Sequence, residues 1–138
     1  MIEFYSEIDF NLSNPESVSK WIRGIIASEG YEVGDIAYTF CDDDQLHKLN
    51  VEFLHHDTLT DIISFDYTTG KQIHGEIFIS IDRVQENATE LHVPFEEELH
   101  RVMIHGILHY CGYKDKSDTE LAIMRGKEEE ALQTRPIA

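Results

Sequence analysis

His105 and His109 are the residues whose types and spacing most directly suggest chemistry. They lie four residues apart, and on a helix such residues point the same way because successive residues turn by about 100°. Gly112 can end that helix in a left-handed conformation that glycine adopts at little cost, which lets the chain fold back. Asp115 follows three residues later, where it can supply a third ligand. Three protein ligands with an open fourth position are typical of a catalytic zinc site, so this segment predicts a metal-dependent hydrolase.

The helix expected around the two histidines is apolar over most of its circumference. Its apolar residues are Leu99, Val102, Met103, Ile104, Ile107, Leu108 and Cys111. A helix of this kind is normally buried. The narrow polar stripe that remains carries His105, His109 and Glu98, with Arg101 at its edge. Unpaired polar groups in a core cost about 1–3 kcal/mol each. Core histidines that bond to carbonyl groups or to each other are the alternative, but the glycine and aspartate that follow favour a metal.

Length and composition predict one domain over residues 1–138. The chain is 41% hydrophobic and 28% charged, as expected of a soluble globular protein. We find no apolar run near the roughly 20 residues of a membrane span and no signal-like N-terminus. Its two cysteines, Cys41 and Cys111, have no ligand-like spacing, so we expect free thiols and a cytoplasmic protein.

The formal net charge is −16, from 27 acidic and 11 basic residues. Such a charge opposes non-specific binding to phosphate backbones. Runs of three acidic residues start at Asp42, Glu96 and Glu128, and we interpret all three as solvated helix faces or helix starts favoured by the helix dipole. Contact with a nucleic acid would therefore need a local basic patch or a bound metal ion.

The segments that must position these residues predict an α+β fold. Expected strands span residues 2–5, 36–40, 61–66 and 75–80. The first expected helix begins after Asn14 and ends at Gly30, and the second begins at Asp42 and includes Phe53. Three further helices are expected over residues 82–91, 95–111 and 117 to about 132. Four strands and about five helices without strict alternation favour a four-stranded mixed sheet packed with helices over a doubly wound sheet. The metal site lies at the end of the buried helix, and we expect His74, His92 and His100 on the surface or in loops.

Three segments resemble the YbeY-type endoribonucleases, zinc-dependent bacterial enzymes that cut single-stranded RNA and mature ribosomal RNA. They are residues 49–65, 75–80 and 105–113, of which the last matches the family's metal motif closely. The resemblance implies an α+β fold with a metal in a cleft between the ligand helix and the sheet. It also implies single-stranded or ribosomal RNA as the substrate, no membrane partner and no DNA.

Two positions depart from the family pattern. Asp115 replaces the usual third histidine; a carboxylate oxygen is an accepted zinc ligand, although another divalent metal is an alternative. Leu54 stands where the family usually carries an arginine implicated in activity, and leucine cannot bind a phosphate. Candidates for substrate contacts in its place are His55, His56, Ser64, Lys71, Arg101, Lys114 and Lys116. Asp61 and Glu98 are candidates to orient a metal-binding histidine from outside the ligand set, although Thr60 and Asp61 can equally shape the start of a strand.

The favoured function is therefore hydrolysis of an RNA phosphodiester by a metal-activated water, held by His105, His109 and Asp115. The sequence identifies no general base. A different class of function is a non-catalytic ribosome-assembly factor that a metal stabilises and that binds ribosomal proteins through its acidic surface. A peptidase is a third hypothesis, but the glutamate base of the His-Glu-x-x-His metalloproteases is replaced here by Gly106.

Overall fold

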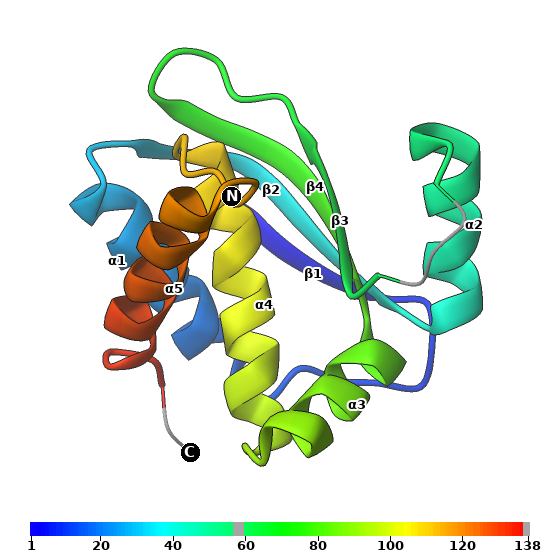
Figure 1. The fold of residues 1–138 in the computed structure, drawn as a ribbon. Helices are drawn as coiled ribbons and strands as arrows, with labels where there is room; N and C mark the ends of the chain where they lie inside the picture. The colour runs from blue at the N-terminus through cyan, green and yellow to red at the C-terminus, as the bar shows by residue number, and fades with distance from the viewer. Residues whose placement is uncertain (57–59, 137–138) are drawn as a thin grey trace.

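The fold, described by a computed structural model for residues 1–56 and 60–136, combines one mixed sheet with helices on both of its faces (Figure 1). The strands are β1 (Ile2–Ser6), β2 (Glu32–Cys41), β3 (Ile62–Asp66) and β4 (Gln72–Ser80). The helices are α1 (Pro15–Ser28), α2 (Asp43–Leu54), α3 (Ile81–Leu91), α4 (Phe95–Tyr110) and α5 (Asp118–Leu132). The predicted α+β class, with a four-stranded mixed sheet and five helices in the described chain, is confirmed.

The strands lie in the order β1-β2-β4-β3. β1 and β4 both run parallel to β2, while β3 pairs antiparallel with β4 at the edge. Helices α1, α4 and α5 lie on one side of this sheet and α2 lies on the other (Figure 1). Because side chains alternate along a strand, Ile77 and Ile79 point into the main core while Phe78 packs under α2.

Helix ends follow the signals in the sequence. Asp42 and Ser117 each accept a hydrogen bond from the backbone N–H three residues later, and each forms a reciprocal capping box. Gly112 has a φ of 98° after the end of α4, as predicted. Asn14 precedes α1, although its side chain makes no capping hydrogen bond.

Helix α4 is the central helix of the larger layer, as its apolar pattern predicted. Residues on most of its circumference are buried, including Val102, Met103, Ile104 and Ile107. The buried hydroxyl of Tyr38 on β2 donates to the carbonyl of Met103 at 2.9 Å, which fixes the helix on the sheet. In the described part of the chain, none of the helices combines the length and the apolarity that crossing a membrane requires.

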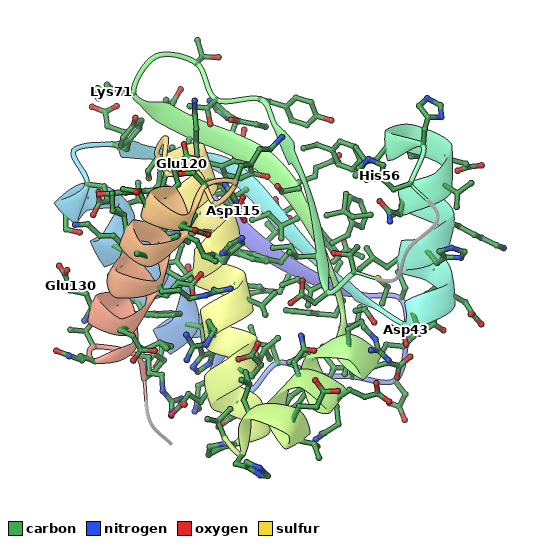
Figure 2. The ribbon with its side chains drawn as sticks, viewed as in Figure 1. Asp43, His56, Lys71, Asp115, Glu120 and Glu130 are labelled. Carbon is green, nitrogen blue, oxygen red and sulfur yellow. The ribbon has the colours of Figure 1, made fainter. Side chains whose placement is uncertain are left out.

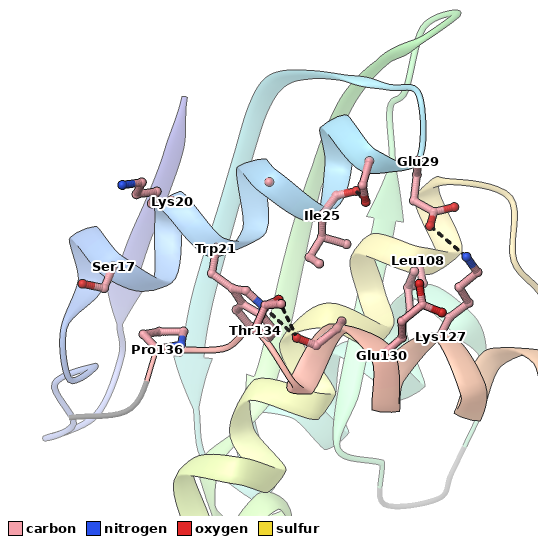
Figure 3. Close-up of a pocket in the computed structure, with 13 residues that line it drawn as sticks. Ser17, Lys20, Trp21, Ile25, Glu29, Leu108, Lys127, Glu130, Thr134 and Pro136 are labelled. Atoms are coloured by element: carbon pink, nitrogen blue, oxygen red, sulfur yellow. Dashed lines mark hydrogen bonds and ion pairs between the residues drawn. The ribbon is translucent and has the colours of Figure 1, made fainter.

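Helix α5 is fastened to α1 along a groove of about 560 Å³ (Figure 3). The Trp21 indole donates to the carbonyl of Ala131 at 2.9 Å, and Thr134 donates to the same oxygen at 3.1 Å. Farther along, Lys127 pairs with Glu29 at 3.3 Å. These contacts fix the rotation of α5, so that Glu128, between Lys127 and Ala131, faces inward.

His100 corrects the expectation that it lies on the surface. Its side chain is 3% exposed on α4 and packs against Trp21, with ring centroids 5.4 Å apart. Arg135 donates to its Nδ1 at 3.1 Å, since a guanidinium group has no acceptor. Burial, and then the charge of Arg135, lowers the pKa of His100 from 6.5 to about 4.

The free energy of unfolding should therefore decrease as the pH is lowered from 6.5 toward 4, because in that range the unfolded chain binds a proton at His100 and the folded protein does not. Its contribution is complete above pH 6.5 and is lost as pH falls toward 4, about 2 kcal/mol between pH 7.5 and 5. Urea unfolding of His100→Gln should show a pH-dependent loss smaller by about that amount. The exposed His92→Asn variant serves as the control, and equal losses in all three proteins would contradict this account.

Candidate metal centre

The structure brings together the three residues that the sequence predicted as metal ligands. His105 and His109 lie one turn apart at the end of α4, and Asp115 returns toward them from the segment that follows. The two Nε2 atoms are 3.0 Å apart, and Asp115 Oδ2 lies 3.2 Å from His109 Nε2 and 3.3 Å from His105 Nε2. All three side chains are partly buried, and together they could hold a metal ion.

The return of Asp115 depends on the turn that ends α4. The N–H of Gly112 donates to the carbonyl of His109, and the N–H of Tyr113 donates to that of Leu108, both at 3.0 Å. This pair of bonds is a Schellman motif, which requires a left-handed residue such as Gly112. The turn places the Tyr113 carbonyl 2.9 Å from His109 Nδ1, so the same few residues reverse the chain and orient a histidine.

In their neutral forms, both histidines present an Nε2 lone pair to the site. A carbonyl oxygen only accepts, so His109 donates its Nδ1–H to Tyr113. His105 donates its Nδ1–H to Glu128 Oε2 at 2.7 Å. Burial raises the pKa of Glu128, but hydrogen bonds from His105 and Arg125 outweigh burial and bring it below its usual value, so the carboxylate is ionised and accepts. With both protons on Nδ1, each Nε2 is the free nitrogen that binds metals.

The donor set fits a divalent metal. Ligands about 2.0–2.2 Å from a tetrahedral zinc ion lie about 3.3–3.6 Å from one another. The three donor atoms form a triangle with edges of 3.0, 3.2 and 3.3 Å. Two lone pairs and a carboxylate oxygen at this separation repel one another unless a cation lies among them.

Glu128 is the main candidate site residue that sequence reasoning missed. Its side chain is fully buried. Besides His105, it accepts from Arg125 Nη1 at 2.6 Å and Arg101 Nη1 at 3.3 Å. Its burial could have been predicted from its helical spacing from Met124 and Ala131, which are also buried on α5. Its position within a run of three acidic residues instead suggested an exposed side chain.

The interpretation of the acidic runs as solvated faces or helix starts is therefore wrong for one member, Glu128, whereas Glu98 is a helix-start residue as predicted but is not solvated. Glu128 is fully buried against α4, and Glu98 is only 4% exposed although it lies in the first turn of α4. Glu98 accepts from Arg101 Nε at 3.1 Å. Burial raises the pKa of Glu98, with Arg101 opposing that shift. Both carboxylates belong to a buried ionic network rather than to the solvated surface.

A polar cleft of about 600 Å³ contains His105 and Asp115 in its lining. Asp61, just before β3, also lines it and accepts from Asn87 at 3.2 Å. Burial raises the pKa of Asp61, and the nearby His105 opposes that shift. Asp61 and Glu98, the two carboxylates predicted to orient a histidine, both line the cleft, but His105 donates its Nδ1–H to Glu128 instead.

The predicted substrate contacts are dispersed, and only Arg101 lines the described cleft. His55 and His56 follow α2 in exposed positions, and His56 lies far across the view from Asp115 (Figure 2). Lys71 lies 4.3 Å above the Tyr31 ring, outside the cleft. Other residues named from the sequence are Ser64 on β3, exposed Lys114 and Lys116, and Leu54, the last residue of α2, 41% exposed.

Gly106 leaves little space for the glutamate of a metalloprotease. A Cβ atom there would lie 3.0 Å from Ile77 Cδ1 and 3.2 Å from Ile62 Cδ1. A longer, charged side chain would enter the apolar contact between α4 and the sheet, where an unpaired charge is costly. The packing therefore accounts for the glycine beside the first histidine.

Comparisons with known proteins show which family the chain belongs to. The family model described as Endoribonuclease YbeY matches residues 5–135. The chain belongs to this family. A Flavobacterium johnsoniae relative named Endoribonuclease YbeY is 57% identical over 132 residues, covering 96% of this chain and 95% of that protein. A relative of the same name from Flavobacterium psychrophilum is 58% identical, covering 96% and 94% of the two chains.

A solved structure has a similar fold. The solution structure of a Thermotoga maritima protein aligns with a TM-score of 0.64 at 27% sequence identity. The alignment covers 96% of this chain and 87% of that one. This chain therefore shares its fold with the Thermotoga maritima protein over almost its whole length.

Proposed function

We propose that this YbeY-family protein is a zinc-dependent endoribonuclease that cleaves single-stranded segments of ribosomal RNA, with residues 1–138 acting as one domain in the cytoplasm. The observation that carries the proposal is the triangle of donor atoms from His105, His109 and Asp115, set beside a polar cleft. The names of the relatives above support RNA as the substrate.

The donor types support zinc. Two imidazole nitrogens and one carboxylate oxygen form a three-ligand set like those of catalytic zinc sites, although other divalent transition metals accept the same ligands. When bound, the metal would supply Lewis-acid polarisation of the phosphate and a more acidic water.

The chain's own residues prepare the site for that metal. Glu128 and the Tyr113 carbonyl hold the two Nδ1 protons, so both Nε2 atoms stay directed at Asp115. Gly112 permits the turn that brings Asp115 back. Asp61, held by Asn87 on the cleft wall, places a further carboxylate where it can accept a proton from an attacking group.

Cleavage of a labelled, unstructured RNA by zinc-loaded protein tests the proposal. We expect cutting of the single strand, with little cutting of the matching duplex or of DNA with the same sequence. His109→Ala should lower the rate by about 100-fold or more, while the exposed His92→Asn variant should cleave normally. The ends of the products distinguish two routes of cleavage, attack by water and attack by the RNA's own 2′-hydroxyl. Only the second route leaves a 2′,3′-cyclic phosphate.

Failure of the zinc-loaded wild-type protein to cleave RNA would contradict the proposed activity. It would favour the non-catalytic alternative, in which the metal stabilises a ribosome-assembly factor that binds ribosomal proteins through its acidic surface. Cleavage of unstructured peptide, lost in His109→Ala, would instead favour a peptidase.

A further inference from the structure

The cleft beside the metal centre is strongly acidic for a site that would bind RNA. Its lining carboxylates in the described chain are Asp61, Glu90, Glu98, Asp115 and Glu128. Two guanidinium groups, of Arg101 and Arg125, lie among them. A phosphodiester entering the cleft would be repelled by this wall unless a cation besides the metal faces it. Which arginine is free to do so is decided by their contacts.

Arg101 is fully engaged with protein carboxylates. Its Nε, Nη1 and Nη2 atoms pair with Glu98, Glu128 and Glu129 at 3.1, 3.3 and 3.0 Å. Its side chain is only 17% exposed. Each of its three nitrogens therefore has a carboxylate partner, and binding a phosphate would require breaking a partly buried ion pair.

Arg125, unlike Arg101, is exposed and has few partners. Its side chain is 53% exposed, and Nη1 pairs with Glu128 Oε1 at 2.6 Å. A guanidinium group carries five N–H donors in a planar fork. Within the described chain its hydrogen-bonding partner is Glu128 alone, so most of that fork is available to a ligand.

Glu128 links Arg125 to the metal centre. One of its oxygens accepts from Arg125, and the other accepts from His105 Nδ1 at 2.7 Å. A single buried carboxylate thus fixes one side of the guanidinium group while orienting a candidate metal ligand. This arrangement sets a pre-oriented cation in the lining of the cleft that His105 and Asp115 also line.

We propose that Arg125 binds a phosphate of the RNA strand in this cleft, next to the phosphate that the metal engages. The assignment rests on the proposed function for its substrate. The fork geometry suits a phosphate better than a lysine ammonium does, because two parallel N–H groups can bond two phosphate oxygens.

Binding of a fluorescein-labelled, unstructured RNA to metal-loaded and metal-free protein tests this inference. Arg125→Ala should weaken binding by about 5- to 20-fold in both forms and reduce the salt dependence of log K by about 0.7, the value for one phosphate contact on a single strand. Arg125→Lys should give an intermediate affinity. Arg23→Ala, which removes the same charge from an exposed position on α1 outside the cleft, should leave both quantities near wild type.

Two further readouts separate this inference from general damage and from failure of the proposed function. Arg125→Lys keeps a cation beside the buried Glu128, so its zinc content and thermal stability should stay near wild type, while its KM for RNA cleavage rises. Equal affinities and salt slopes for Arg125→Ala and Arg23→Ala would overturn the inference even if the wild type cleaves RNA. Wild-type protein that binds RNA through Arg125 without cutting it would overturn the proposed activity alone, and absence of RNA binding would overturn both.

Discussion

Replacing Glu128 with alanine is expected to lower the free energy of unfolding by about 3–5 kcal/mol, because it leaves the largely buried Arg101 and His105 without this carboxylate. Glu128 is fully buried and accepts hydrogen bonds from His105, Arg125 and Arg101. It also orients His105, so the dissociation constant for zinc should rise by about 10- to 100-fold. Urea unfolding of metal-free protein and competition with a chelating dye measure the two effects separately.

Glu129→Ala is the matched control for this prediction. Glu129 is adjacent on α5 and pairs with Arg101 at 3.0 Å, but its side chain is 63% exposed. An exposed ion pair contributes about 0–1 kcal/mol, so this variant should remain near wild type in both assays. Glu128→Gln keeps the shape and an acceptor oxygen, and it should fall between the two. Equal behaviour of Glu128→Ala and Glu129→Ala would contradict the role assigned to the buried carboxylate.

Gly75→Ala is expected to destabilise the protein by about 3 kcal/mol through its contact with Tyr110, combining overpacking with disturbed hydrogen bonds. A Cβ atom at Gly75 on β4 would lie 2.5 Å from three atoms of the Tyr110 side chain, two in the ring and the hydroxyl oxygen. That hydroxyl lies 3.0 and 3.1 Å from the carbonyl oxygens of Phe65 and Glu76. Because Tyr110 follows His109, its displacement should also weaken zinc binding.

Gly24→Ala and a double-mutant cycle control the Gly75 prediction. A Cβ atom at Gly24 meets nothing within 4 Å on α1, so alanine there should stabilise the protein by about 0.5–1 kcal/mol. Tyr110→Ala removes the ring that Gly75→Ala strikes, so the double variant should be less destabilised than the sum of the single variants. Strict additivity, measured by urea unfolding, would contradict a direct clash.

The elements of the fold could be predicted because their signals are local. Pro15 and Gly30 mark the limits around α1, capping residues start α2 and α5, and alternation or apolar runs mark the strands. Pairing is not local: β4 inserts between β2 and β3, and the sheet order follows from packing over long separations. No single segment of the sequence contains that information.

The candidate site was predictable only where its members are close in sequence. His105, His109 and Asp115 lie within one helix end and its turn, so their spacing predicts their convergence. Glu128 reaches His105 from another helix, and its direction depends on how Trp21 and Glu29 hold α5. His100 was misplaced for the same reason, since its burial comes from Trp21 and Arg135 rather than from its own helix.

Metal content of tag-free protein purified without chelator tests the central claim most directly. Mass spectrometry of the digested wild-type protein should find about one zinc ion per chain, and Asp115→Ala should retain far less. Asp118→Ala, which removes an exposed carboxylate from the first turn of α5, should keep the wild-type content. Wild-type protein without bound metal, or an Asp115→Ala variant that holds as much zinc as wild type, would contradict the assignment of His105, His109 and Asp115 as a metal centre.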